Sequence, residues 1–183
     1  MSEEPAGRGA RRRAGLVEAA ASLILELGPA EVTHRRVAER AGASLSATTY
    51  YFRDLEELRG SGAELIAELW AEQAEWVAER AEEGPLTREE TVELLSEALL
   101  PPAAGVRGHY EQLARAGRSP AVAAAYRAGR ERLAAAVARA LAAAGSTCPA
   151  EVALAVVDGA ALAALSVGGD PRAEAGRLLG EVL

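Results

Sequence analysis

Residues 32–52 decide the fold of this chain, and they read VTHRRVAERAGASLSATTYYF. The pattern predicts two short helices joined by a tight turn. Thr33 and Ser44 are of the residue types that cap helix N-termini, and Gly42 can adopt the left-handed conformation that ends a helix. A second helix with small polar side chains after such a turn is typical of the helix-turn-helix, whose second helix enters the major groove of DNA. The stretch therefore predicts DNA binding.

A wider signature extends from this stretch into its flanks. Its members are Thr33, Val37-Ala38, Ala41-Gly42, Ser44, Tyr50-Tyr51-Phe52 and Glu56-Glu57-Leu58. By these residues the segment 12–58 resembles the TetR/AcrR family of bacterial transcriptional regulators. The resemblance implies an all-α protein with an N-terminal three-helix helix-turn-helix domain, followed by a variable helical domain that binds a ligand and forms a dimer. No motif beyond Leu58 takes part in it.

The composition favours helices throughout the chain. Ala, Leu, Glu and Arg dominate, Lys is absent and half of the residues are apolar, so strong helix formers prevail. Helix start and stop signals predict about nine helices, the number that the resemblance implies. They cover residues 11–27, two parts of 33–52, 54–83, 87–100, 105–117, 120–144, 149–167 and 171–183. Gly60 and Gly62 are weak points at which the helix over 54–83 can bend or divide.

Charge and chain order together suggest the domain plan. Between Arg8 and Arg53 eight arginines face four acids, a net charge of +4, whereas the whole chain carries −7. The excess of positive charge lies where the motif lies, as a phosphate-facing surface requires. We expect a disordered tail over residues 1–9, the helix-turn-helix domain over 10–56 and the effector-binding and dimerisation domain over 57–183.

The second helix of the motif is expected to have two faces. If Ala43, Thr48 and Phe52 pack inward, the other side chains project outward. Phosphate contacts position such a protein, and base-edge contacts specify the DNA sequence. The candidate DNA contacts on and beside the two helices are Thr33, His34, Arg35, Arg36, Ser44, Leu45, Ser46, Thr49, Tyr50, Tyr51 and Arg53.

These candidates suit different contacts. Tyr50 and Tyr51 match an aromatic pair of the family and are candidate phosphate donors. His34 or Arg35 can reach a base edge, where an arginine against guanine is worth roughly 1–3 kcal/mol of discrimination. A solvated helix face is the alternative for the arginines. The run at residues 11–13 likewise either begins a helix in solvent or contacts DNA.

Three residues depart from the family pattern. Leu45 and Leu55 stand where lysines are frequent, and Thr49 stands where a tyrosine is frequent. Arg53 can compensate for Leu55 because it lies beside the same helix start, and Leu45 can contact a thymine methyl group. The departures bear on operator sequence and affinity, not on the DNA-binding class.

The helical remainder offers a few polar side chains among apolar ones, which suits a cavity for a small molecule. Trp70, His109, Tyr110, Tyr126 and Asp158 are the candidates to line it, with ordinary core or surface packing as the alternative for each. Asp158 lies inside an apolar segment, where a buried carboxylate needs a partner. A contact at a helix crossing or a dimer seam would also satisfy it.

No pattern of catalysis or metal binding is present. His34 and His109 lie in different regions, and the single Cys148 has no histidine or acid nearby in sequence. Metal-ligand spacing and a glycine-rich phosphate loop are both absent, so we expect no enzyme activity, metal or cofactor. One cysteine suits a reducing compartment, no signal peptide is visible and the apolar segment 152–167 is too short for a membrane span. We therefore expect a cytoplasmic protein.

Dimerisation is expected because one helix-turn-helix reads few base pairs. Two copies about 34–36 Å apart give useful specificity. The last two predicted helices are expected to join them as a C2 homodimer. The residues expected at the contact are Ala153, Ala160, Ala161, Ala164, Leu178, Leu179 and Leu183.

The sequence thus predicts a ligand-responsive repressor that binds a palindromic operator, with repression implied by the resemblance alone. A small, mostly apolar effector would shift the long helix after Asp54 and change the spacing of the two DNA-binding units. Two alternatives are open. One is a helical small-molecule binding protein without DNA binding, and the other is a DNA-binding regulator without an effector.

Overall fold

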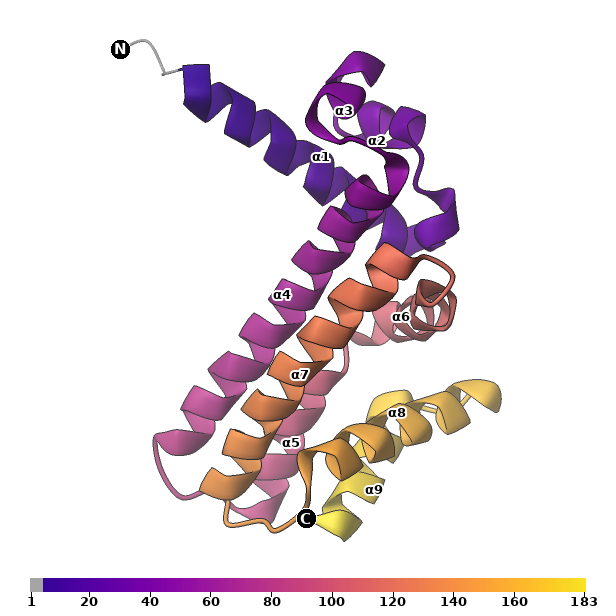
Figure 1. Ribbon diagram of the computed structural model, residues 1–183. Helices are drawn as coiled ribbons and strands as arrows, with labels where there is room; N and C mark the ends of the chain where they lie inside the picture. Colours follow the sequence, from indigo (N-terminus) through magenta and orange to yellow (C-terminus); the bar gives the residue numbers. More distant parts are fainter. Residues whose placement is uncertain (1–4) are drawn as a thin grey trace. The chain divides into compact units, whose positions relative to one another are not determined.

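The computed structural model describes the backbone of residues 5–183 and their side chains except at positions 5, 6 and 104. Over this range the chain forms nine α-helices, one short 3-10 helix and no strand (Figure 1), which confirms the predicted all-α fold. The elements are α1 (Pro5–Leu27), η1 (Pro29–Glu31), α2 (His34–Arg40), α3 (Leu45–Tyr51), α4 (Leu55–Glu82), α5 (Arg88–Leu99), α6 (Ala103–Ala116), α7 (Pro120–Ala143), α8 (Ala150–Ser166) and α9 (Pro171–Val182).

The ends of α2 and α3 form where the sequence predicts them. The Thr33 hydroxyl accepts a hydrogen bond from the backbone N–H of Arg36, and the Ser44 hydroxyl accepts one from that of Ala47. Gly42 has a φ of 59°, the left-handed conformation expected between the two helices. Each cap contributes about 0.5–2 kcal/mol, so local contacts already favour the tight turn.

One local prediction is wrong, and one alternative that the sequence leaves open is decided. Helix α1 begins at Pro5, so residues 5–9 of the expected tail are helical, while residues 1–4 lie outside the described residues. Ala6, Arg8 and the residues Ala10 to Arg13 that follow the segment are strong helix formers and outweigh Gly7 and Gly9. Helix α4 is undivided from Leu55 to Glu82 although it contains Gly60 and Gly62.

Gly60 and Gly62 instead permit close helix packing. A Cβ at Gly62 would lie 2.9 Å from the backbone nitrogen of Ala21 in α1. A Cβ at Gly60 would lie 3.2 Å from the Cβ of Ala121 in α7. The start of α4 therefore approaches both helices because these two side chains are missing, and this packing keeps the helix intact.

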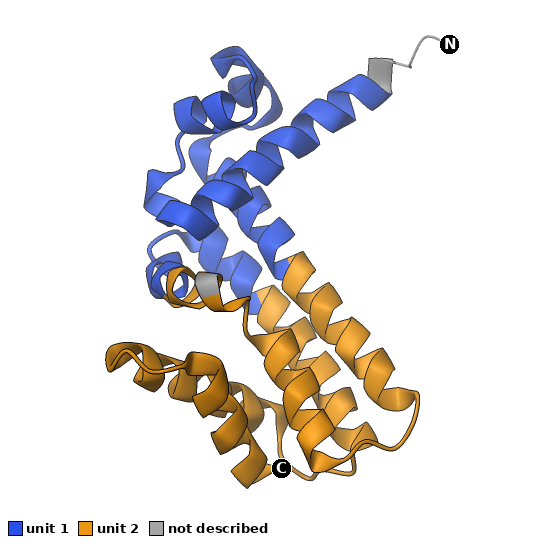
Figure 2. Ribbon diagram, turned by 180° about the vertical axis from the view of Figure 1, so that it is seen from behind, with its two compact units in different colours: residues 1–67, 111–127 blue, residues 68–110, 128–183 orange. Residues whose placement is uncertain are grey.

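Two compact units divide the chain (Figure 2). The first comprises the described residues up to Ala67 and residues 111–127, and the second comprises residues 68–110 and 128–183. The expected boundary after residue 56 falls inside the first unit, where Leu58 is buried and Gly62 packs against α1. Helices α4, α6 and α7 each contribute residues to both units.

The core of the first unit forms under the helix-turn-helix. Helix α1 contacts η1 and α2, and α2 contacts α3. The largest fully buried side chains here recur at helical spacing or end a helix, as the sequence pattern requires. They are Leu16, Ile24, Val32, Val37, Phe52 and Leu58.

In the second unit α8 packs along α9, and α5 packs on both. Arg139 of α7 forms ion pairs with Glu75 and Glu82 of α4, and these helices run side by side in Figure 1. The unit is thus a layered helical body whose core includes Val77, Leu95, Leu141, Val157 and Leu179.

The residues expected at a dimer contact are largely buried within this unit, so that prediction is wrong in detail. Small side chains do allow close helix approach, but within one chain: Ala153, Ala160, Ala161, Ala164 and Leu179 are buried, and Leu178 and Leu183 are half-buried. Helix α8 exposes a different set of apolar and small residues, three or four positions apart and therefore on one face. This α8 stripe consists of Val152, Ala155, Gly159 and Leu162.

Candidate nucleic-acid interface and effector site

Helix α3 turns a polar face to solvent. Thr48 and Phe52 are buried and hold the helix against the first unit. Tyr50 is 81% exposed, so its phenol stands in solvent. The candidates that the structure places in exposed positions on or beside α3 are Ser44, Leu45, Ser46, Thr49, Tyr50 and Arg53.

Aromatic contacts fix the end of this helix. Tyr51 is half-buried and lies edge-on to Tyr50, with the ring centroids 5.0 Å apart. The Arg13 guanidinium of α1 lies 5.1 Å from the centroid of the Phe52 ring, within the range of a cation–π contact. The arginine run at the start of the chain is therefore helical, and Arg13 joins α1 to the end of α3.

The outer face of α2 carries the basic candidates. Arg35 donates to Glu39 at 2.8 Å, Arg36 pairs with Glu31, and all four side chains are exposed. Exposed ion pairs contribute about 0–1 kcal/mol, so a phosphate can replace these carboxylates at little cost. His34 is half-buried, and its Nδ1 is buried with no hydrogen-bond partner among the residues that the structure describes. Arg35 is thus better placed than His34 to reach a base edge.

The start of α4 accounts for one departure from the family pattern. Leu55 is half-buried, so this position serves packing. Arg53 is exposed two positions earlier and pairs with Asp54, with 3.1 Å between Nε and Oδ2. Asp54 in turn caps α4 by accepting the backbone N–H of Glu57 at 2.8 Å. The positive group at the helix start is therefore Arg53.

A clamp between α1 and α2 holds the motif in place. Two guanidinium nitrogens of Arg40 donate to the two carboxylate oxygens of Glu26, each at 2.7 Å. The Ser22 hydroxyl donates to the same carboxylate at 2.8 Å. These hydrogen bonds, that from Arg40 above all, lower the pKa of Glu26 from 4.5 to about 2. The sequence analysis missed this pair because its members meet only after the helices pack.

We expect the clamp to make stability depend on pH. Because folding lowers the pKa of Glu26, the clamp stabilises the protein fully above about pH 4.5, and its contribution is lost as the pH falls towards 2. Glu26→Gln should lower the free energy of unfolding at pH 7 by less than about 1 kcal/mol, since both side chains are partly exposed. Urea unfolding at pH 7, 5, 4 and 3 should show the difference between variant and wild type shrinking. A difference that stays constant over this range would contradict the assignment.

Four of the five candidate effector residues meet in the second unit. The Trp70 ring of α4 lies edge-on to the His109 ring of α6, with centroids 4.9 Å apart. His109 also lies edge-on to Tyr110 at 5.1 Å. The Tyr110 hydroxyl donates to Oδ1 of Asp158 in α8 at 3.1 Å. Three helices therefore join these side chains into one aromatic–carboxylate cluster.

Asp158 has a second partner in the same unit. Nη2 of Arg130 in α7 lies 3.1 Å from its Oδ2. The Asp158 side chain is 33% exposed, so the carboxylate in this apolar helix is half-buried and satisfied at both oxygens. Burial, reinforced by the negative charge of Asp158, raises the pKa of Tyr110. Burial also lowers the pKa of His109, although Asp158 opposes this shift, so the imidazole is neutral at pH 7.

The fifth candidate, Tyr126, belongs to the first unit. Its hydroxyl donates to Oε1 of Gln112 at 2.8 Å, and burial raises its pKa. Gln112 is buried, and its Nε2 has no hydrogen-bond partner among the described residues. Such a donor is a place where a polar ligand group can bind. The sequence analysis missed Gln112 and Arg130, since each reads as an ordinary residue of an amphipathic helix.

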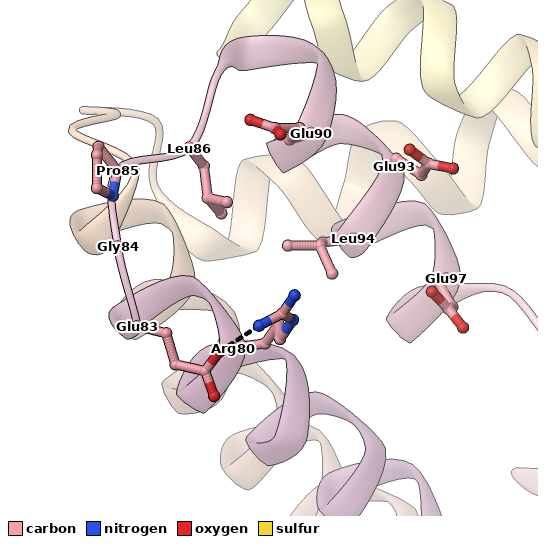
Figure 3. A pocket seen from close by; sticks show the side chains of 9 residues that line it. All are labelled: Arg80, Glu83, Gly84, Pro85, Leu86, Glu90, Glu93, Leu94 and Glu97. Atoms are coloured by element: carbon pink, nitrogen blue, oxygen red, sulfur yellow. Dashed lines mark hydrogen bonds and ion pairs between the residues drawn. The ribbon is translucent and has the colours of Figure 1, made fainter.

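An open cavity of about 420 Å³ lies at the turn between α4 and α5 (Figure 3). Leu86 and Leu94 give it apolar surface, Arg80 pairs with Glu83, and three more glutamates line it. Glu90 is already engaged in the cap of α5, where it accepts the backbone N–H of Thr87. None of the candidate effector residues lines this cavity.

The described residues also bear on metal binding and on membrane insertion. No group of three or more His, Cys, Asp and Glu side chains there is arranged to hold a metal ion. No helix in the described part of the chain combines the length and hydropathy that a membrane crossing requires.

A known protein-family model matches the C-terminal part of this chain. A family model described as "Tetracyclin repressor-like, C-terminal domain" matches residues 86–183, more than half of the chain. The chain belongs to the TetR family. The match covers the region in which the sequence analysis found no family motif, and the signature at residues 12–58 lies outside it. The two observations thus identify a TetR-family transcriptional regulator from opposite ends of the chain.

Solved structures of TetR-family type share this fold. The multidrug binding protein EbrR complexed with malachite green is 29% identical, with 94% of this chain and 98% of that chain covered and a TM-score of 0.69. EbrR complexed with proflavin is 29% identical over 94% of this chain and 99% of that chain, with a TM-score of 0.67. A member of the TetR family from Streptomyces coelicolor A3 is 28% identical, with 94% of this chain and 98% of that chain covered and a TM-score of 0.67. No curated protein matches the chain.

Proposed function

We propose that this TetR-family regulator is a repressor that binds a palindromic operator as a homodimer and responds to a small molecule. The observation that carries the proposal is the exposed polar face of α3, which follows the turn at Gly42 and ends at Tyr50. Helix α2, which contacts α3, carries the exposed Arg35 and Arg36, and DNA recognition requires such a combination of phosphate-binding and base-reading groups. Family membership likewise favours a regulator over an enzyme, and action on DNA places the protein in the cytoplasm.

The proposed DNA contacts divide into two sets. Tyr50, Thr49, Ser44 and Ser46 offer hydroxyls on the exposed side of α3, and Leu45 offers an apolar contact. Further cations come from Arg35, Arg36 and Arg53, while Thr33, His34 and Tyr51 complete the proposed surface. Hydroxyls and arginines are common phosphate ligands, whereas arginine and apolar groups also read base edges.

The aromatic–carboxylate cluster is the proposed effector site. Trp70, His109 and Tyr110 supply ring surface and Asp158 a carboxylate. Tyr126, paired with Gln112 in the first unit, is a separate candidate for a ligand contact. EbrR, with the same fold, was solved with several organic dyes, which supports a small, mostly apolar effector. Trp70 lies on α4, the helix that follows the DNA-binding motif without interruption. A ligand that prefers one position of α4 would therefore shift the DNA-binding equilibrium.

The α8 stripe is the proposed contact between two copies. Its residues are apolar or small, and Leu162 is 51% exposed. A C2 axis beside α8 would pair the stripe with itself, which is the self-complementary contact that a homodimer needs. The proposed dimer uses the C-terminal helices, like the one predicted from the sequence, but through residues on the outer face of α8.

Substitutions on the proposed DNA surface are expected to weaken binding. In a homodimer Arg35→Gln removes two cations, and Tyr50→Phe removes two hydroxyls worth about 1 kcal/mol each, so each substitution should weaken binding about ten- to 25-fold. If Arg35 contacts a phosphate in each protomer, its loss should also reduce the salt dependence of the logarithm of affinity by about two units. Fluorescence anisotropy with a duplex from upstream of the chain's own gene, at several salt concentrations, measures both effects.

Arg132→Gln is the matched control, because Arg132 is an exposed arginine in the second unit. It should leave DNA affinity unchanged. Equal effects of Arg35→Gln and Arg132→Gln would contradict the assigned surface. If the wild-type protein bound small molecules but no duplex, the helical small-molecule binding protein would be favoured. Duplex binding that no ligand affects would favour a regulator without an effector.

A further inference from the structure

Another open cavity, of about 530 Å³, lies between α5 and α9 in the second unit. Its volume is within the range of about 300–1,000 Å³ that is typical of small-molecule sites. Val92 of α5 gives this α5–α9 groove apolar surface, and Gly176 and Gly180 of α9 leave it wide. A Cβ at Gly176 would lie 3.6 Å from Cγ1 of Val92, and one at Gly180 would lie 3.8 Å from Cγ2. Side chains at these two positions would fill the groove.

The groove contains a buried hydroxyl that the protein itself does not use. Ser96 of α5 lines the groove and is 5% exposed, and its Oγ has no hydrogen-bond partner among the described residues. A Cβ at Gly176 would lie 3.8 Å from this oxygen, so the hydroxyl lies against the glycine that keeps this part of the groove empty. A buried hydroxyl without a partner costs free energy, and most such groups in proteins are paired. The Ser96 hydroxyl is therefore a donor that a ligand oxygen can satisfy.

Arg172 of α9 brings a positive charge to the same end of the groove. It is half-buried and lies one helical turn before Gly176. Its Nη2 donates to the backbone oxygens of Leu100 at 3.0 Å and Pro101 at 3.4 Å, and the N–H of Leu100 donates to the backbone oxygen of Ser96. These carbonyls orient the guanidinium, and no described carboxylate pairs with it. Two kinds of donor thus meet at the Ser96 end of the groove.

The other charged groups of the groove lie nearer to solvent. Arg88, Glu89, Glu93 and Arg177 are all exposed. Arg177 pairs with two glutamates of its own helix, and Glu93 also lines the cavity at the turn between α4 and α5. Because water and salt screen exposed charges more than partly buried ones, the guanidinium at the Ser96 end has the larger effect on a ligand inside the groove. This end therefore favours a negatively charged group.

We propose that the α5–α9 groove binds an organic carboxylate with a flat apolar body. The Arg172 guanidinium pairs with the carboxylate, and the Ser96 hydroxyl donates a hydrogen bond to one of its oxygens. The planar guanidinium matches a planar carboxylate in geometry. The body of the ligand lies along Val92 and the two glycines. The site is separate from the aromatic–carboxylate cluster, so the inference goes beyond the proposed function and does not depend on it.

Cinnamate, a flat aromatic carboxylate, and cinnamamide, its uncharged analogue, are the probes for this groove. Each is titrated into the full-length protein at pH 7 by isothermal titration calorimetry. The wild type should bind cinnamate at least about tenfold more tightly than cinnamamide, and Arg172→Gln should remove this preference, because hydrogen bonds between charged groups are the stronger ones. Ser96→Ala should weaken cinnamate binding about three- to tenfold. Gly176→Val, which fills the groove, should prevent binding of both probes.

Arg132→Gln, at an exposed arginine of α7, is the control and should leave both affinities unchanged. Because Ser96 has no described partner in the unbound protein, Ser96→Ala should not lower the thermal midpoint, so that its loss of binding is not a loss of folding. Circular dichroism checks the fold of the other variants.

Four results would overturn the proposal. They are the absence of cinnamate binding by the wild type at millimolar concentration, equal affinity for the two probes, an effect of Arg172→Gln no larger than that of Arg132→Gln, and loss of binding in Asp158→Asn instead, which would place the ligand in the proposed effector site. Duplex binding measured without either probe tests the proposed function separately, since a wild type that binds no DNA refutes the regulator while leaving the cinnamate result intact.

Discussion

Leu162→Glu is expected to convert the protein into a monomer and to remove operator binding at concentrations that saturate with the wild type. Leu162 lies in the exposed α8 stripe, and a C2 axis there would bring the two introduced carboxylates together in an apolar contact. Burial of unpaired like charges costs several kcal/mol, so the dimer dissociation constant should rise at least about a hundredfold. Sedimentation velocity and duplex anisotropy measure the two effects.

Leu69→Glu provides the control for this substitution. Leu69 is a leucine of α4 with 54% of its surface exposed, close to the 51% of Leu162, and it lies in the same unit. The same change of charge there should leave both the dimer and DNA binding intact. A dimer that survives Leu162→Glu, or one that Leu69→Glu dissociates, would show that α8 is not the contact.

Gly62→Ala should destabilise the protein although alanine is the better helix former. In a helix interior the exchange favours alanine by about 1 kcal/mol. At this position, however, the new Cβ would lie 2.9 Å from a backbone nitrogen and 3.0 Å from the Ala20 Cβ of α1. Overpacking against a rigid neighbour costs about 1–3 kcal/mol, so after the gain in helix propensity the net effect should be a loss of up to about 2 kcal/mol. Urea unfolding of the intact chain gives this difference.

Gly15→Ala is the matched control within the same unit. Among the described residues, a Cβ at Gly15 in α1 meets no atom within 4 Å outside the adjoining helix backbone, so only the gain in helix propensity should remain. The two substitutions are therefore expected to have opposite signs. If Gly62→Ala stabilised the protein as much as Gly15→Ala does, the close approach of α1 and α4 would be wrong.

The predictions from sequence succeeded where the signal is local. The caps at Thr33 and Ser44 and the turn at Gly42 depend on a few adjacent residues, and the structure has all three. Helix boundaries were also predicted closely, because proline, glycine and capping residues mark them. Residues 5–9 were an exception. The two glycines of this short segment led to a prediction of disorder, whereas the structure has a helix there.

Contacts between distant residues could not be predicted in the same way. Gly62 carries no sign in the sequence that α1 lies against it, and Ala153 and Ala160 pack equally well inside one chain or between two. The need of Asp158 for a partner was foreseen, but its partners lie 28 and 48 positions away. Such pairings follow from the packing of whole helices, which periodicity alone does not specify.

The stoichiometry of the protein on its own operator tests the central claim most directly. A labelled duplex that contains the palindrome upstream of the chain's own gene is titrated with protein and followed by sedimentation. We predict two protomers per duplex, with an affinity that falls steeply as salt rises because several phosphates are contacted. A protein that stays monomeric at micromolar concentration and binds no duplex in dilute buffer would contradict the account.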